Sequence, residues 1–172
     1  CNWKGKRFSV RMKDSIAVVD DFFDEKELNI INNNLHKITF KGLKNKNGLY
    51  GFGHPFLRDK ENEWIFDKIK KVFIKDMKLK SIESSFRLKH NYKQVLPHED
   101  TFADYAFLCF LKGKELLYNG TGFYNDKNEL DRYVGFKENR ALFYSSRVFH
   151  TDLQALGPSS SRYSMNIFYK YA

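Results

Sequence analysis

Residues 104–112 read DYAFLCFLK, a run of apolar and aromatic residues between two charged ones. Runs of this kind are typical of β-strands. Three further runs share its aromatic character: SSFRLKHNY (residues 84–92), RALFYSS (140–146) and RYSMNIFYK (162–170). Glycine and asparagine turns separate them. From about residue 81 onward, the sequence therefore predicts antiparallel sheets packed as a sandwich, barrel or jelly roll.

The residues before this point mix a short strand with two helices. Residues 15–19, reading SIAVV, form an apolar strand candidate. Asp24 followed by Glu27 has the pattern of a helix N-cap with a capping box, and apolar residues then recur at helical spacing. A second amphipathic helix is expected after Asp59 and should run to about Met77. The apolar positions that define these two helices are Leu28, Ile31 and Leu35, then Ile65, Ile69, Val72 and Phe73.

Residues 42–56 contain four glycines and end in Gly-Phe-Gly-His-Pro. A phosphate-binding loop is excluded, because no strand precedes these glycines with a helix immediately following. The composition instead predicts a flexible surface loop. That loop is either a substrate lid or an ordinary connection. His54 faces substrate in the first case and is a surface or structural residue in the second.

The length and composition fit one domain. A chain of 172 residues with 42% hydrophobic residues is long enough to bury a single core. We expect residues 1–172 to form one unit, with a helical support over about 1–80 and a β core over about 81–172. No internal repeat or second domain boundary is visible.

The net charge and the cysteine content bear on the binding partners and the cellular compartment of the protein. A formal net charge of +9 favours an acidic partner or serves solubility alone. Cys1 and Cys109 are the only cysteines, which excludes a disulfide framework and a cysteine-based zinc site and fits a reducing cytoplasm. No run approaches the roughly 20 apolar residues of a membrane span, and no signal peptide is visible. The lysines of the second helix are expected on a solvated face: Lys68, Lys70, Lys71, Lys75, Lys78 and Lys80.

Candidate metal ligands lie just before the first long apolar run. His98 and Asp100 form a His-x-Asp pair, and alternation in an extended segment places both side chains on one side. Alone the pair is a weak signal, because His150 and Asp152 form a second one. No histidine follows the second pair to supply a third ligand, so the order along the chain favours His98, Asp100 and His150. Two imidazoles and one carboxylate form the facial triad of non-haem iron(II) oxygenases, which leaves coordination positions open for a bidentate cosubstrate and O₂.

A basic residue follows the triad in the last strand candidate. Arg162 and Ser164 alternate onto one face there, together with Asn166. A buried guanidinium can bind a carboxylate through two hydrogen bonds, and the Ser164 hydroxyl can add another. An arginine in a surface salt bridge is the alternative if Arg162 stands alone.

These motifs together resemble the signature of the 2-oxoglutarate- and iron(II)-dependent dioxygenase superfamily. The Asn91-Tyr92 segment, the Gly120-Thr121-Gly122-Phe123 hairpin and the strand around AVVDDFF (residues 17–23) are similar to segments of its prolyl-4-hydroxylase-like branch. The tyrosine of that branch lies near the cosubstrate. The chain departs from the branch in two ways: the spacing from Tyr92 to His98 is shorter, and Arg162 stands where lysine is common.

The resemblance implies a fold, a set of cofactors and an activity. The fold is α+β but mainly β, a double-stranded β-helix (jelly roll) with N-terminal helices packed on one sheet. The cofactors are Fe(II), held by His98, Asp100 and His150, together with 2-oxoglutarate and O₂. 2-Oxoglutarate would be bound by Arg162, Ser164 and Tyr92. Asp100 favours hydroxylation over halogenation, because halogenases of the superfamily lack the carboxylate ligand.

Three functions remain open at this stage. The first is a hydroxylase acting on a protein side chain, an amino acid or a small metabolite. The second is a catalytically silent jelly-roll protein that binds acidic partners. The third is a nucleic-acid-modifying oxygenase, against which Phe168 argues, because demethylases of the superfamily carry a second arginine at that spacing. The sequence identifies neither the substrate nor the oligomeric state.

Overall fold

Strands dominate the computed structural model, which describes residues 15–45, 48–56, 58–89, 96–116, 119–152 and 161–172. The elements in these ranges follow one another in the order β1 (Ile16–Val19), α1 (Glu25–Leu35), β2 (Lys41–Asn45), β3 (Gly48–Pro55), α2 (Glu63–Phe73), β4 (Leu79–Lys89), β5 (Tyr105–Lys112), β6 (Thr121–Tyr124), β7 (Leu130–Val134), β8 (Ala141–Ser145), β9 (His150–Asp152) and β10 (Arg162–Tyr171).

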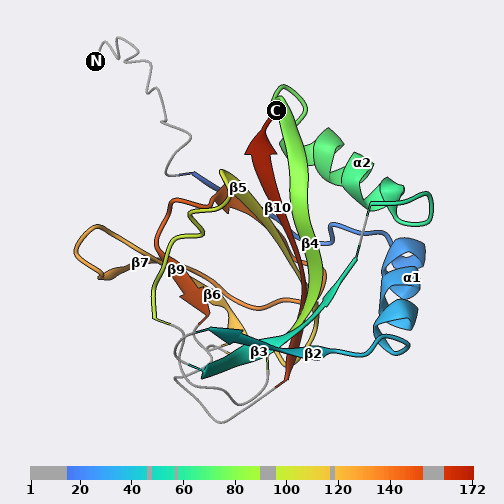
Figure 1. The fold of residues 1–172 in the computed structure, drawn as a ribbon, viewed down its shortest axis with the longest axis horizontal. Helices are drawn as coiled ribbons and strands as arrows, with labels where there is room; N and C mark the ends of the chain where they lie inside the picture. The colour runs from blue at the N-terminus through green and yellow to red at the C-terminus, as the bar shows by residue number, and fades with distance from the viewer. Residues whose placement is uncertain (1–14, 46–47, 57, 90–95, 117–118, 153–160) are drawn as a thin grey trace, which may run out of the picture.

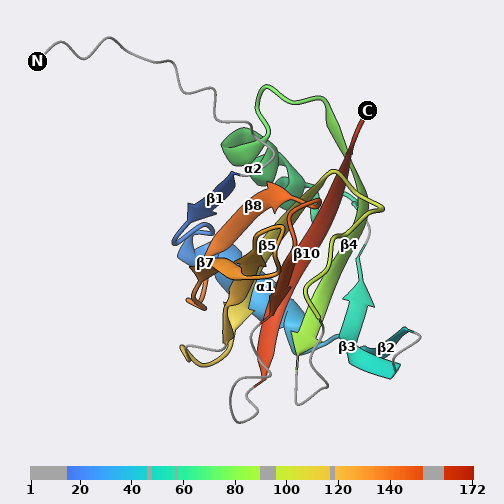
Figure 2. The ribbon, with the colours of Figure 1, turned by 90° about the vertical axis from the view of Figure 1, so that its left-hand side faces the viewer.

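The strands form two antiparallel sheets. The large sheet has seven strands in the order β1-β8-β5-β10-β4-β3-β2, and the small sheet has three in the order β7-β6-β9. Figure 1 shows the small sheet on one side of the large sheet and both helices on the other. Figure 2, turned by 90°, shows the long strands β4, β5, β8 and β10 side by side. The mainly β fold with helices on one sheet, predicted from the sequence, is confirmed.

Successive side chains of β5 and β10 point to opposite faces of the large sheet, so each face carries its own layer of apolar residues. Phe107 and Cys109 of β5, with Met165 and Ile167 of β10, are fully buried on the face that α1 and α2 cover. The next residues along β5, Leu108 and Phe110, point to the opposite face and pack with Phe123 of the small sheet. This second layer forms the interior of the jelly roll.

Both helices bury one face and are short. The predicted capping box of α1 is confirmed, because the Asp24 carboxylate accepts from the Glu27 backbone N–H while the Glu27 carboxylate accepts from that of Asp24. The second helix is shorter than predicted. It begins at Glu63, because Asp59 caps a preceding turn through its carboxylate, and it ends at Phe73. Neither helix of the described ranges is long and apolar enough to cross a membrane.

The prediction of a flexible loop over residues 42–56 is wrong. β2 and β3 form a hairpin there, and β3 continues the large sheet by pairing with β4. The glycines have a packing role that composition alone does not reveal. A side chain at Gly53 would lie 3.0 Å from Leu43, so the glycine leaves room for the leucine of the neighbouring strand. The first 80 residues therefore supply strands as well as the helical support.

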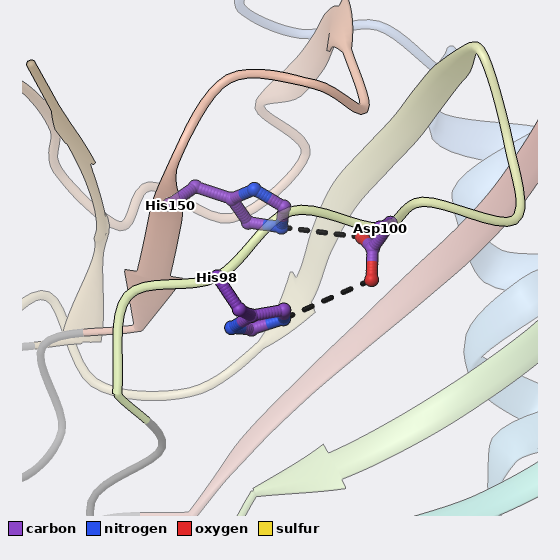
Figure 3. Close-up of side chains that lie close together, drawn as sticks. All are labelled: His98, Asp100 and His150. Atoms are coloured by element: carbon purple, nitrogen blue, oxygen red, sulfur yellow. Dashed lines mark ion pairs between the residues drawn. The ribbon is translucent and has the colours of Figure 1, made fainter. Parts of the chain in front are cut away.

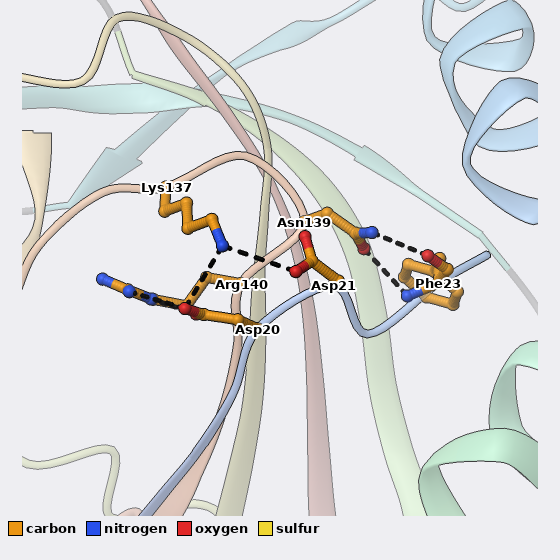
Figure 4. A network of polar contacts seen from close by, with 6 residues as sticks. All are labelled: Asp20, Asp21, Phe23, Lys137, Asn139 and Arg140. Atoms are coloured by element: carbon orange, nitrogen blue, oxygen red, sulfur yellow. Dashed lines mark hydrogen bonds and ion pairs between the residues drawn. The ribbon is translucent and has the colours of Figure 1, made fainter. Parts of the chain in front are cut away.

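A polar network joins the turn after β1 to the segment before β8 (Figure 4). Arg140 donates to both carboxylate oxygens of Asp20, at 2.6 and 3.0 Å, and the Lys137 ammonium lies 3.3 Å from the same group. The buried Asn139 amide accepts from the Phe23 backbone N–H at 2.8 Å and donates to its carbonyl at 2.7 Å. These contacts fix the turn that leads from the sheet into α1.

Candidate metal centre

His98, Asp100 and His150 converge at the edge of the jelly-roll interior. Their candidate ligand atoms all lie within 4.8 Å of one another. His150 begins β9, and His98 lies in the segment before β5 and forms a two-residue antiparallel bridge with it. The backbone N–H of each histidine donates to the carbonyl of the other, at 3.1 and 3.0 Å. This bridge places the two imidazole rings side by side, with centroids 4.9 Å apart.

Asp100 completes the cluster from the same segment as His98. Its backbone N–H donates to the Ser146 carbonyl at 2.9 Å, which anchors the segment to the end of β8. Its two carboxylate oxygens lie 3.7 Å from Nε2 of His98 and 3.3 Å from Nε2 of His150. Figure 3 shows both imidazoles directed at this carboxylate.

Both histidines are oriented by their second ring nitrogen. Nδ1 of His98 lies 2.9 Å from the Leu96 carbonyl, and Nδ1 of His150 lies 2.9 Å from the Val148 carbonyl. A carbonyl can only accept, so each Nδ1 carries a proton, and each Nε2 faces Asp100. Histidine ligands of protein-bound metals are held in the same way. Two imidazole Nε2 atoms and a carboxylate, gathered around one point, fit a divalent transition metal such as iron(II).

The cluster is open on one side. The side chain of His150 is 9% exposed and that of Asp100 is 17% exposed, whereas His98 is 43% exposed. Phe123 and Tyr144 cover the His150 ring, with centroids 6.3 and 5.1 Å away. A bound metal would therefore be screened from solvent on the His150 side and reachable past His98.

Asp152, the carboxylate of the second His-x-Asp pair, does not take part in the cluster. The Asp152 carboxylate pairs instead with the Lys89 ammonium at 2.9 Å, and both side chains are mostly buried. This ion pair joins β9 of the small sheet to β4 of the large one. Lys89 is also the cross-strand partner of Arg162, so the lysine and the arginine share one face of the large sheet.

Arg162 is buried at the start of β10, with 5% of its surface exposed. Its Nη1 donates to the carbonyls of Asn119 and Gly120, at 2.5 and 2.9 Å. The guanidinium lies 5.1 Å from the centre of the Phe110 ring, in the interior layer. Burial lowers the pKa of Arg162, which the charge of Asp152 opposes. The Arg162 Nε–H is buried and has no acceptor in the described part of the chain.

Three other residues were predicted from the sequence to lie at or near the site: Ser164, Tyr92 and His54. Ser164 shares the face of Arg162, but its hydroxyl lies 2.8 Å from the Asn166 side-chain oxygen, to which it donates. Its proton is therefore engaged within β10. Tyr92 lies outside the described residues. His54, whose Nδ1 lies 3.0 Å from the Thr39 carbonyl, is a strand residue of β3 and not part of a lid.

Tyr144 is a site residue that the sequence analysis missed. It lies in β8 with 4% of its surface exposed, and the edge of its ring meets His150 and Phe123. Burial raises the pKa of its hydroxyl, and the nearby Asp100 carboxylate adds to the effect. The sequence alone does not single out Tyr144, because an aromatic residue in a run such as RALFYSS is expected in any buried strand, whatever the function of the protein.

The fold is shared with solved structures of one enzyme class. An oxidoreductase of the 2OG-Fe(II) oxygenase family from Burkholderia pseudomallei superposes with a TM-score of 0.69 at 10% identity, covering 91% of this chain and 86% of that one. A prolyl hydroxylase from Trichoplax adhaerens, in complex with a hypoxia inducible factor peptide, gives 0.65 at 10% identity over 91% and 83%. HygX from Streptomyces hygroscopicus, with nickel and 2-oxoglutarate bound, gives 0.65 at 8% identity over 90% and 82%.

Sequence comparison adds no closer relation, since no family model and no curated protein matches the chain. The structural likeness nevertheless extends over about nine-tenths of the chain. The protein has the double-stranded β-helix fold of the 2-oxoglutarate- and iron(II)-dependent oxygenases. Within that fold it carries a His-Asp-His cluster at the edge of the jelly-roll interior.

Proposed function

We propose that this protein is a 2-oxoglutarate-dependent iron(II) oxygenase that hydroxylates its substrate. The observation that carries the proposal is the convergence of His98, Asp100 and His150 within this fold, with each imidazole Nε2 directed at the Asp100 carboxylate. HygX, which has the same fold, binds nickel and 2-oxoglutarate. To this chain we assign 2-oxoglutarate together with iron(II) in place of nickel.

The three ligands define what the chain contributes to the reaction. Iron(II) held by the triad would supply the activation of O₂, with overall conversion of 2-oxoglutarate, O₂ and a substrate C–H group into succinate, CO₂ and the hydroxylated product. The two backbone carbonyls accept from Nδ1 of each imidazole and so keep each Nε2 aimed at the metal. The apolar cover of Phe123 and Tyr144 excludes water from the His150 side.

Arg162 would hold the carboxylate of 2-oxoglutarate that is remote from the metal. Its Nε–H is a buried donor without an acceptor, and a buried polar group in that state is costly unless a ligand satisfies it. The charge of the guanidinium suits a carboxylate. Ser164 and Tyr92 remain proposed contacts of the same cosubstrate.

The substrate is proposed at the level of a class: a protein side chain, an amino acid or a small metabolite. The exposed side of His98 is where such a group would approach the metal. The buried, unpaired Cys109 thiol and the predicted absence of disulfides support a cytoplasmic setting.

The test is an anaerobic titration of the protein with iron(II) and 2-oxoglutarate. We expect a weak visible charge-transfer band, and succinate on admission of O₂. Mass spectrometry of candidate peptides and metabolites should show products 16 mass units heavier, in step with succinate. Absence of both the band and succinate would favour a silent jelly-roll protein, and oxidised single-stranded oligonucleotides would indicate a nucleic-acid substrate.

Substitution of the ligands should remove both signals. We expect His98→Ala or Asp100→Ala to abolish 2-oxoglutarate turnover, because two remaining ligands hold the metal weakly. His54→Ala is the matched control, since His54 also contacts a backbone carbonyl but lies in β3 away from the cluster. Turnover at the wild-type level in either ligand variant contradicts the proposed function.

A further inference from the structure

Arg87 is a partly buried cation on the inner face of the large sheet. Its cross-strand partner in β10 is Ser164, and directly opposed residues of neighbouring strands project from the same face. Ser164 shares that face with Arg162, whose guanidinium lies 5.1 Å from the Phe110 ring of the interior layer. Phe86, the neighbour of Arg87 along β4, packs in the layer on the helix side. Arg87 therefore points toward the side of the sheet on which the metal cluster lies.

The inner face of β4, which lies beside β10 in Figure 2, is bounded at both ends by elements that carry the metal ligands. At one end, the Lys89 ammonium binds a carboxylate of β9, the strand that supplies one of the histidines. At the other end, Glu83 is the cross-strand partner of Phe168, whose ring packs on that of Phe102 with centroids 4.8 Å apart. Phe102 belongs to the segment that supplies the other two ligands. Arg87 lies on β4 between these two ends, so it borders the opening beside the cluster.

The guanidinium of Arg87 is only partly engaged by the protein. Its Nε–H donates to the Ser85 hydroxyl at 2.7 Å, and its Nη2 donates to the Glu83 carboxylate at 3.0 Å. These bonds use two of the five N–H groups of a guanidinium. The side chain is 19% exposed, so donors remain for an anion that enters the opening.

The charge of Arg87 is weakly compensated. The Glu83 side chain is 46% exposed, and ion pairs open to solvent contribute little to stability. On the side away from β10, the cross-strand partner of Arg87 is Gly53, which has no side chain to place over the guanidinium. Because a guanidinium can bind a carboxylate through two parallel hydrogen bonds, an acid that enters the opening can displace Glu83 or bind beside it.

An exposed aromatic ring lies at the same level of the opening. Phe102 is 43% exposed, although it packs on Phe168. Arg87 reaches along β4 to Glu83, the cross-strand partner of Phe168, so its guanidinium and the Phe102 ring flank the same part of the opening. A molecule with a carboxylate and an apolar body can contact both.

We propose that Arg87 is a substrate-binding residue that holds a carboxylate of the substrate, while an apolar part of the substrate packs on Phe102. The substrate is then a carboxylic acid: a small acid, an amino acid or an acidic side chain of a protein. The inference rests on the proposed function, because the acid is oxidised only if the cluster holds iron(II) and 2-oxoglutarate.

The test is a calorimetric titration of the protein loaded anaerobically with iron(II) and 2-oxoglutarate, so that no turnover occurs. The probes are phenylacetate and phenylacetamide, which have nearly the same shape but differ in charge. We expect the wild type to bind the acid about tenfold or more tightly than the amide, the size typical of hydrogen bonds to a charged group. Arg87→Met should remove this preference. Arg87→Lys should retain part of it, because lysine keeps the charge but not the planar fork of donors.

Glu83→Gln separates a binding role of Arg87 from a structural one. The variant removes the competing carboxylate, so phenylacetate should bind more tightly than in the wild type. A purely structural Arg87–Glu83 pair predicts instead that Arg87→Met and Glu83→Gln weaken binding alike. Arg58→Met is the matched control, because Arg58 also pairs with a glutamate, Glu63 at 2.8 Å, but does so beside α2. It should leave the preference for the acid unchanged.

A second pair of probes identifies the source of the carboxylate. It consists of a short peptide with blocked ends and a single glutamate, and the same peptide with glutamine. Binding of the glutamate peptide that depends on Arg87 assigns the site to an acidic protein side chain. A dependence on Arg87 that is confined to phenylacetate assigns it to a small acid.

Failure of this inference is distinct from failure of the proposed function. If the protein does not bind 2-oxoglutarate, but the unloaded protein still prefers the acid through Arg87, the proposed function fails and the acid site stands. If 2-oxoglutarate binds, but the wild type shows no preference for the acid or Arg87→Met keeps that preference, the role of Arg87 is overturned.

Discussion

Individual residues in this protein are oriented mainly by the backbone. His98 and His150 exchange two main-chain hydrogen bonds, and each ring then contacts the carbonyl two residues earlier in its own segment. The direction of both imidazoles therefore follows from strand geometry and does not need further side chains. Such ligands are preorganised, so a metal does not have to order them on binding.

Arg162 gives a test at the scale of one side chain. Arg162→Lys retains a positive charge, but a lysine ammonium cannot reproduce the planar fork of donors. We expect 2-oxoglutarate affinity to fall about tenfold or more, while iron(II) affinity stays the same. Calorimetric titration of each ligand measures both effects. Arg140→Lys is the control, because Arg140 binds Asp20 outside the site. Unchanged 2-oxoglutarate affinity in Arg162→Lys would show that the cosubstrate is held elsewhere.

The sequence predicted the cluster residues better than their surroundings. His98, Asp100 and His150 could be selected by residue type and order along the chain, because metal coordination requires specific atoms. Tyr144 could not be selected in this way. Its relevance depends on which neighbours β8 acquires when β5 and β1 pair with it, and these pairings join residues far apart in the chain.

At the scale of elements, the β2–β3 hairpin shows where composition is misleading. Glycines 42, 51 and 53 suggested a flexible loop, but they lie in paired strands. Propensity for β-structure depends on the neighbouring strands, and here large side chains from the adjacent strand pack where the glycines have none. The helices were easier to predict, since an N-cap and an apolar stripe are local features. The capping box of α1 is confirmed in full.

The turn between β1 and α1 makes stability depend on pH. Arg140 and Lys137 lower the pKa of Asp20 from 3.8 to about 2, chiefly through the hydrogen bond from Arg140. A carboxyl group with a lowered pKa in the folded state stabilises the fold above its unfolded value, and this contribution is lost as the pH falls from about 4 to about 2. Asp20 is partly exposed, so we expect about 1 kcal/mol or less at pH 7.

Urea unfolding at several pH values measures this contribution. Asp20→Asn should be less stable than the wild type at pH 7, and the difference should shrink as the pH falls from about 4 to about 2, where the wild-type carboxyl group is becoming protonated. Asp131→Asn, which changes an exposed carboxylate in β7, is the control and should show little difference at either pH. A constant difference for Asp20→Asn across this range would mean that charge on Asp20 is not its source.

At the scale of the whole molecule, the proposed site lies where the two sheets meet. His150 and Asp152 belong to the small sheet, while Arg162 and Lys89 belong to the large one. The interior layer between the sheets is apolar around Phe123 and Leu108 and becomes polar at these four residues. Any change in the spacing of the sheets would therefore change the distance between the metal cluster and Arg162.

The Lys89–Asp152 ion pair is the contact that should maintain this spacing. Its side chains are 18% and 13% exposed, so each charge is partly desolvated and depends on the other. Asp152→Asn or Lys89→Met alone should lower the free energy of unfolding by about 1–3 kcal/mol, because each removes this ion pair from a mostly buried charge. The double variant should lose less free energy of unfolding than the sum of the two single losses, as measured by urea unfolding in a double-mutant cycle.

The exposed Asp131–Arg132 pair, treated in the same way, should show almost no coupling. If the Lys89 and Asp152 losses simply add, the ion pair does not hold the sheets together, and the spacing between His150 and Arg162 must depend on the apolar layer alone.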